Sequence, residues 1–176
     1  MGTLNLGGAT LSASGGNWTD APPGTIIQII QAASDTHLSV SSITPAAIVS
    51  ATITPKSVSS KILIQYTAAA SFDGGGSHAN TCILKNGAKI AVADSGTGSG
   101  EQVRANKTFY DNAGATDGNT MNSLSGSFLD SPATTSAITY AVGGFSNNTN
   151  VSTYNRRISS DQYGQVSEII LMEVAQ

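Results

Sequence analysis

The stretch NTCILKNGAKIAVA, residues 80–93, decides the fold class. Two apolar runs flank Asn86-Gly87, and these two residue types accept the positive backbone torsions that a two-residue hairpin turn requires. The stretch therefore predicts a β-hairpin. It also holds Cys82, the only cysteine, which excludes an intrachain disulfide and is expected to be a buried, inert thiol.

Strand patterns continue on both sides of this hairpin. In residues 123–130, Leu124, Gly126 and Phe128 alternate with outward serines, which is the period of a half-buried strand. No window shows apolar residues at helical spacing over three turns. The remaining predicted strands are residues 25–31, 37–43, 47–54, 61–69, 102–110, 136–145, 151–158 and 165–174.

Roughly eight to ten short strands separated by turn signals are typical of a sandwich or jelly roll. We expect an all-β fold, a jelly-roll-like antiparallel β-sandwich, as a head domain over residues 25–176. A short extended stem or docking arm is expected over residues 1–24. Because the first and last strands of a jelly roll commonly lie near each other, residues 25–31 and 165–174 should share one buried location.

The composition excludes several function classes. Charged residues make up only 11% of the 176, against about 25% in ordinary domains, whereas Ser and Thr number 43. The net charge is -3 with scattered basic residues, which argues against nucleic-acid binding. The apolar runs are shorter than the roughly 20 residues that cross a bilayer, and no signal-peptide pattern begins the chain, so neither membrane insertion nor export is expected.

Two parts of the chain need partners. Leu4, Leu6 and Leu11 fit a short strand whose apolar side has no cover of its own, and an isolated strand is not stable. The run EIILM, residues 168–172, is apolar at consecutive positions, so we expect cover on both faces, one from the core and one from a neighbouring subunit. The candidate interface residues are Leu4, Leu6, Leu11, Ile26, Ile27, Ile29, Ile30, Ile169, Ile170, Leu171 and Met172.

A resemblance covers nearly the whole chain. GTLNLGGATLSASGGNW resembles the repetitive stem segments of bacteriophage tail fibres and related virion appendages. GTIIQIIQ, ATITPKSVSSKILIQY, FLDSPATTSAITYAV and EIILMEV resemble the C-terminal β-domain of such fibres, especially in phages of marine and cyanobacterial hosts. The resemblance implies a homotrimeric jelly-roll head on a stem, made in the host cytoplasm and exposed on the virion surface.

Three functions are compatible with this resemblance. The first is receptor binding by a tail-fibre-type appendage that contacts the host envelope. The second is capsid decoration, as a cement or head-fibre protein, because a 24-residue stem is short for a fibre and favours direct docking into a capsid, baseplate or tail. The third, an extracellular lectin-like module of a bacterium, is disfavoured by the lack of an export signal.

The loop over residues 145–157 is the candidate receptor site. Aromatic rings stack on sugar faces, and amides and guanidinium groups bond to hydroxyls or acidic sugars, so a host surface glycan or protein is the expected ligand. The alternative is a solvated loop with a surface tyrosine. The candidate residues are Asn147, Asn148, Asn150, Tyr154, Arg156 and Arg157.

We expect no enzyme activity, no cofactor and no metal. His37 and His78 lack metal-ligand spacing, and the loop at residues 111–119 departs from a calcium-loop pattern. No acidic residue has a spaced partner that predicts a glycosidase pair, and no G-x-S-x-G occurs. The acidic candidates weighed were Asp73, Asp94, Glu101, Asp130 and Asp161.

Overall fold

A computed structural model describes residues 2–6, 9–14, 17–18, 21–72, 78–92, 105–110, 121–146, 150–157 and 163–176. For residues 2–6, 9–14 and 17–18, Phe72 and Tyr110 only the backbone is described. All elements in this part of the chain are strands, which confirms the all-β prediction, and neighbouring strands pair antiparallel. The strands are β1 Gly2–Leu6, β2 Ala9–Ser14, β3 Asn17–Trp18, β4 Ile26–Ser34, β5 Leu38–Val40, β6 Ala46–Ile53, β7 Lys61–Phe72, β8 His78–Lys85, β9 Ala88–Ile90, β10 Lys107–Tyr110, β11 Asn122–Asp130, β12 Ile138–Phe145, β13 Ser152–Tyr154 and β14 Ser167–Val174.

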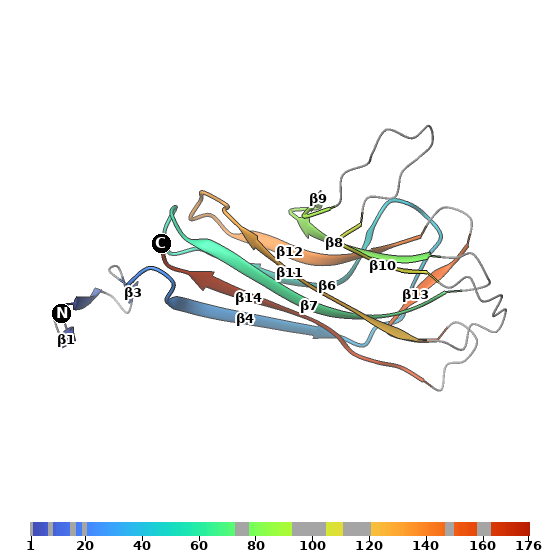
Figure 1. Cartoon of the computed structure of the whole chain (residues 1–176), viewed down its shortest axis with the longest axis horizontal. Coiled ribbons are helices and arrows are strands. Elements are labelled where there is room, and N and C mark those ends of the chain that lie inside the picture. Colours follow the sequence, from blue (N-terminus) through green and yellow to red (C-terminus); the bar gives the residue numbers. More distant parts are fainter. Residues whose placement is uncertain are drawn as a thin grey trace.

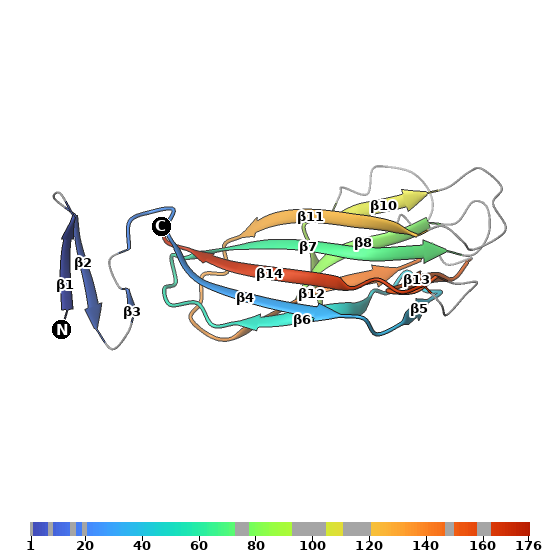
Figure 2. The same ribbon diagram turned by 90° about the horizontal axis from the view of Figure 1, so that it is seen from below.

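Two sheets pack face to face as a sandwich (Figure 1). The six-stranded sheet has the order β4-β14-β7-β13-β5, with β11 on the other edge of β7, and the five-stranded sheet has the order β10-β8-β12-β6, with β9 beside β8. Figure 2 looks onto the six-stranded sheet, where β11, β7, β14 and β4 lie side by side.

The strand pairings are nested along the chain. β4 and β5 pair with β14 and β13, β6 pairs with β12, β7 with β11, and β8 with β10. Nested pairs of this kind describe one long hairpin wrapped around a common core, which is the jelly-roll arrangement. The predicted fold class is therefore confirmed.

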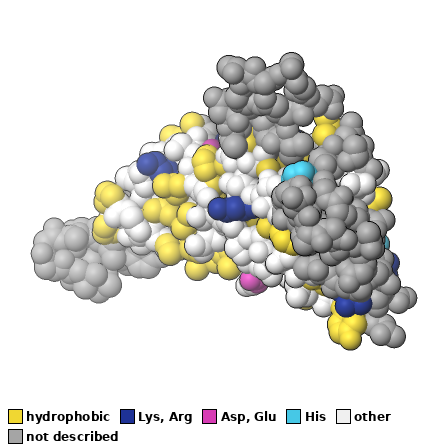
Figure 3. All heavy atoms as spheres, turned by 45° about the vertical axis from the view of Figure 1, so that its right-hand side comes forward, with side chains coloured by type: hydrophobic (Ala, Val, Ile, Leu, Met, Phe, Trp, Pro, Cys, Tyr) yellow, Lys and Arg dark blue, Asp and Glu magenta, His cyan; other side chains and the backbone are white. Residues whose placement is uncertain are grey.

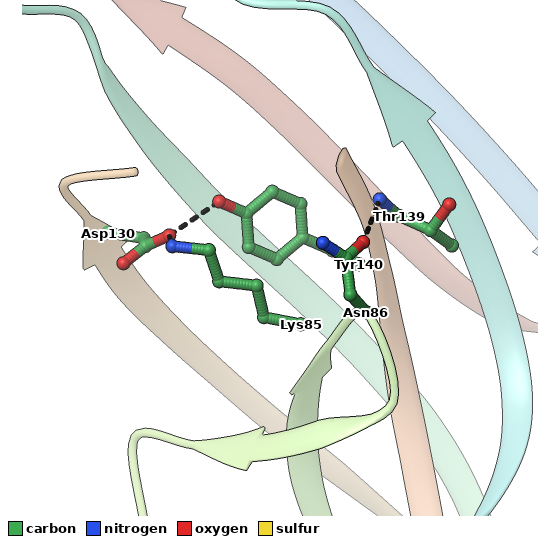
Figure 4. A network of polar contacts seen from close by, with 5 residues as sticks. All are labelled: Lys85, Asn86, Asp130, Thr139 and Tyr140. Atoms are coloured by element: carbon green, nitrogen blue, oxygen red, sulfur yellow. Dashed lines mark hydrogen bonds and ion pairs between the residues drawn. The ribbon is translucent and has the colours of Figure 1, made fainter. Parts of the chain in front are cut away.

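The hairpin at residues 80–93 is present as β8 and β9. Asn86 and Gly87 have positive φ angles of 48° and 85°, and Lys85 pairs with Ala88 across the turn. Asn86 also fixes the neighbouring strand, because its Oδ1 accepts a 3.0 Å hydrogen bond from the Thr139 backbone amide (Figure 4). The turn residues thus shape the hairpin and attach it to β12.

The alternating apolar residues form the core between the sheets. Ile62, Ile64 and Tyr66 of β7 are buried and share one cluster with Ile138 and Tyr140 of β12. Full burial of one such side chain stabilises the fold by about 1.5–3 kcal/mol. The sandwich therefore has a continuous core within a single copy of the chain.

The first and last strands of the sandwich are neighbours, as expected, with Met172 opposite Ile29. One face of β14 meets the core of its own chain, as expected, and cover of the other face by a neighbouring subunit remains a prediction. Ile169 and Leu171 are fully buried in its own core, whereas Ile170 and Met172 are only half-buried on the opposite face. Because alternate residues of a strand face opposite ways, Ile169 and Leu171 cannot also lie in an interface.

Polar contacts stabilise the end of the sandwich at which β4 begins. We call this end the stem end. The Tyr140 hydroxyl donates a 2.5 Å hydrogen bond to Asp130 Oδ2, and Lys85 Nζ lies 2.6 Å from the same oxygen (Figure 4). Burial and the neighbouring carboxylate raise the pKa of Tyr140. Glu173 is also buried there, accepting a 2.7 Å hydrogen bond from the Lys56 backbone amide.

The N-terminal strands β1, β2 and β3 form a separate antiparallel sheet in which Leu4 pairs with Leu11. The chain then enters the sandwich beside its last residues, because the Gly24 amide bonds to the Ala175 carbonyl at 2.9 Å. In the described part of the chain, no helix has the length and apolarity needed to span a bilayer.

Candidate functional site

The outer faces of the two sheets differ in how their apolar side chains are covered. On the outer face of the five-stranded sheet, Cys82, Phe145 and Leu84 are buried in a second small cluster with Val92 packed against it. Lys89 lies 4.0 Å from the centroid of the Phe145 ring. Burial raises the pKa of Cys82 to about 11, which is the inert thiol that the sequence predicted.

The outer face of the six-stranded sheet carries a row of apolar side chains without such cover. Met172 pairs with Ile29 on one side and with Leu63 on the other, and Leu63 pairs with Leu129. Ile29 is 59% exposed and Leu129 is 47% exposed. We call these four residues the apolar row, and they cross β4, β14, β7 and β11 near the stem end.

The same face becomes polar further along the strands. The next row is Gln31, Ile170, Gln65 and Ser127, and the one after it is Ala33, Glu168, Thr67 and Ser125. Over these rows lies a groove of about 560 Å³, here called the polar groove. Its lining residues are Gln65, Tyr66, Thr67, Asn106, Lys107, Ser125, Gly126, Ser127, Glu168 and Ile170.

The floor of the polar groove is held by a buried hydrogen-bond network. The Tyr66 hydroxyl donates to Asn106 Oδ1 at 2.7 Å and lies 2.9 Å from Thr81 Oγ1. Asn106 Nδ2 donates to the Ala91 carbonyl at 3.0 Å. A Cβ on Gly126 would collide with both Asn106 Oδ1 and the Tyr66 ring, so any other residue here would have to displace these side chains. Burial raises the pKa of Tyr66 to about 12.

Tyr154, predicted to present its ring to a ligand, is instead a core residue, which corrects that prediction. Its side chain is fully buried, and its hydroxyl donates to the Asn80 carbonyl at 2.6 Å and accepts from the Phe145 amide at 3.0 Å. Burial raises the pKa of this phenol. The ring packs against Gly144, which leaves no face for a sugar.

The other predicted receptor residues are only partly described. Asn147 and Asn148 lie outside the described residues. Asn150 is half-buried, and its carbonyl accepts a hydrogen bond from Ser146 Oγ. Arg156 and Arg157 are half-buried, and the guanidinium of Arg157 stacks 4.5 Å from the centroid of the Tyr163 ring.

Asn155, which the sequence did not single out, organises this end of the sandwich. It is buried with a positive φ of 66°, and its Nδ2 donates to the Thr36 carbonyl at 2.9 Å. Its own amide donates to the Ala69 carbonyl at 3.1 Å. The segment that contains the two arginines is therefore fixed by backbone contacts.

The ionisable residues of the described part do not form a metal cluster of three or more ligands. His37 bonds to Ser39 at 3.1 Å, and burial together with nearby Arg156 lowers its pKa. Asp130 is occupied by Tyr140 and Lys85. The other acids weighed, Asp73, Asp94, Glu101 and Asp161, and the loop at residues 111–119 lie outside the described residues.

The surface seen in Figure 3 carries few charged side chains, scattered among uncharged polar and hydrophobic ones. Sequence reasoning missed the polar groove because its lining side chains come from β7, β11, β14 and the segment at residues 106–107. The outward alternation of Gln65 with Thr67, and of Ser125 with Ser127, was a usable signal, but only the strand pairing brings these residues together. Comparison of the chain with known protein families and with curated proteins finds no match.

Proposed function

We propose that the chain is a structural protein of a bacteriophage virion, a homotrimeric surface appendage of the tail-fibre type that contacts the host envelope. The resemblance of its stem and strand motifs to such appendages supports this proposal. The observation that carries it is the apolar row, because a contiguous exposed apolar patch marks an interaction site.

The apolar row is suited to contact between subunits. Its most exposed members, Ile29 and Leu129, come from the two outer strands of the six-stranded sheet, so the patch extends across the whole sheet. Burial of one such side chain contributes about 1.5–3 kcal/mol, and three copies multiply that gain against the entropy lost on association. The patch includes one residue of the predicted interface, Met172, in addition to Ile29. Two further predicted residues, Ile26 and Ile170, flank it.

The alternative is capsid decoration, in which the head clamps the shell and the N-terminal segment docks into it. The self-contained pairing of β1, β2 and β3 favours a docking module of this kind, because these strands pair only with one another among the described strands. Both candidates use a trimer, so oligomeric state does not separate them.

Labelling of virus particles tests the proposal. Antibodies raised against the purified chain should bind intact phage particles and stop labelling when the particles are stripped of appendages. Few copies at the tail would support receptor binding, and many copies at three-fold positions of the shell would support decoration. A purified chain that sediments as a stable monomer at micromolar concentration, with no labelling of any particle, would contradict both.

A further inference from the structure

We propose that the polar groove on the six-stranded sheet is a binding site for a neutral saccharide. This inference deepens the proposed receptor-binding function and rests on it for biological meaning. It moves the ligand site from the loop at residues 145–157 to the flat of the sheet. The groove volume of about 560 Å³ falls within the range of about 300–1,000 Å³ that is usual for ligand sites.

The chemistry of the lining selects the ligand class. Three hydroxyl side chains, Thr67, Ser125 and Ser127, face the groove together with the exposed amide of Gln65. Such groups exchange hydrogen bonds with hydroxyls but offer little apolar area, which disfavours a lipid or an aromatic ligand. The aliphatic side chain of Ile170 supplies one apolar wall for the C–H face of a pyranose ring.

The described lining residues carry one charge of each sign. Among them, Glu168 is the only carboxylate and Lys107 the only ammonium group. Glu168 accepts a 3.2 Å hydrogen bond from Gln31 through Oε2, and among the described residues Oε1 has no protein donor. A carboxylate oxygen in this position can accept hydroxyl protons of a sugar, and charge-assisted bonds of this type are stronger than neutral ones. One positive and one negative side chain together give no net charge that would favour an anionic ligand.

The site is also preorganised. Gly126 and the Tyr66–Asn106 hydrogen bond fix the floor, and Thr67 Oγ1 lies 3.1 Å from Ser125 Oγ across two paired strands. Groups held on rigid strands lose little entropy when a ligand binds. Hydrolysis of a glycosidic bond requires two carboxyl groups, and the described lining residues supply one, so we expect binding without cleavage.

Chemical-shift titration of the ¹⁵N-labelled full chain tests the site. The neutral probes are maltose, lactose, mannobiose and N,N′-diacetylchitobiose, and the anionic probes are N-acetylneuraminic acid and inorganic phosphate, all at millimolar concentration. At least one neutral probe should shift the Thr67, Ser125 and Ser127 amide signals saturably and remain intact. Absence of shifts with every neutral probe, shifts confined to residues 150–157, or tighter binding of an anionic probe would overturn the proposal.

Two serines on one strand supply a matched pair of variants. Ser127→Tyr should fill the groove and weaken binding at least about 10-fold, whereas Ser123→Tyr, on the same exposed face of β11 but outside the lining, should change it by less than about 2-fold. Glu168→Gln, which preserves shape, should weaken binding about 10-fold. Equal binding by all variants would also overturn the proposal.

These measurements need only the purified chain. If antibodies label particles but the groove binds no saccharide, the virion proposal stands and the saccharide-site proposal fails. If the groove binds a saccharide but no particle is labelled, the saccharide-site proposal stands and the virion proposal fails. The two failures are therefore distinguishable.

Discussion

The two halves of the outer face of the six-stranded sheet are built by the same four strands and yet differ in chemistry. Near the stem end, Ile29, Met172, Leu63 and Leu129 form the apolar row, whereas two residues further along, Gln31, Ile170, Gln65 and Ser127 begin the polar half. Apolar contact is non-directional and grows with area, which suits lasting association of identical surfaces. Hydroxyls and amides require matched partners, which suits recognition of a ligand.

The outer face of the other sheet shows that exposure of an apolar row is not inevitable. There Phe145 and Leu84 are buried in a second cluster with Ala105 and Val92, so the chain covers that face by itself. The six-stranded sheet receives no comparable cover from the described residues, since Ile29 and Leu129 remain largely exposed. The difference identifies the face that the proposed trimer would cover.

The largest expected effect is on subunit association, when charged residues are introduced into either half of this face. Ile29→Asp combined with Leu129→Asp should prevent the proposed trimer from forming, because two exposed apolar side chains in each of three subunits would contribute on the order of 10 kcal/mol to association. The matched control, Gln31→Asp combined with Ser127→Asp, changes the same strands in the polar half and should leave the trimer intact. Sedimentation at micromolar concentration distinguishes them, and identical behaviour of both double variants would break the comparison.

A smaller effect is expected beneath the polar groove. Gly126→Ala should lower the free energy of unfolding by about 2–3 kcal/mol, because the added Cβ would displace Asn106 Oδ1 and approach Tyr66 Cε1 at 2.7 Å. Urea denaturation gives the value. Ser125→Ala, one residue earlier and exposed, should change it by less than about 0.5 kcal/mol. Comparable stability of both variants would show that the floor of the groove is not tightly packed.

The smallest effect concerns the pKa of the buried phenol under the groove. Because the pKa of Tyr66 is raised from 10 to about 12, the unfolded chain loses this proton first as the pH rises. Stability from this group is complete below pH 10 and is lost as the pH rises through about 12, by up to about 1.4 kcal/mol per pH unit.

Urea denaturation of the wild-type chain and of Tyr66→Phe at pH 8, 10 and 11 measures this contribution. Tyr66→Phe should flatten the alkaline decline, and Tyr163→Phe, at a residue that is 57% exposed, serves as the control and should leave it unchanged. An alkaline decline that is equally steep with and without Tyr66 would mean that its hydroxyl is already solvated in the fold.

Much of the sandwich could be predicted from local patterns. Asn86-Gly87 specified its hairpin, and Leu124 turned inward between exposed serines, because turn torsions and strand alternation are properties of short segments. The prediction was wrong for two residues of the apolar run in β14. Ile169 and Leu171 were expected in an interface, but the chain's own core covers them. A run of apolar residues predicts that these side chains are buried, but it does not say whether the same chain or another subunit buries them.

The candidate receptor loop contains the opposite error, a residue that was predicted at the surface and lies in the core. Tyr154 lies among asparagines and arginines in the sequence, so its surroundings predict a surface position. In the fold, β13 pairs with β7 and β5, and the phenol enters the core to bond to Asn80 and Phe145. Sequence neighbours did not determine its exposure, because the contacts that bury it come from strands far along the chain.

The sequence by itself determined the all-β class, the turn at Asn86 and the alternation of each strand, since these depend on the torsions and spacing of adjacent residues. Only the tertiary structure decided that Ile29, Met172, Leu63 and Leu129 align in one row and that Gln65, Ser127 and Glu168 line one groove. Strand register is set by long-range pairing around a shared core, and a shift of one residue would turn every one of these side chains to the other face.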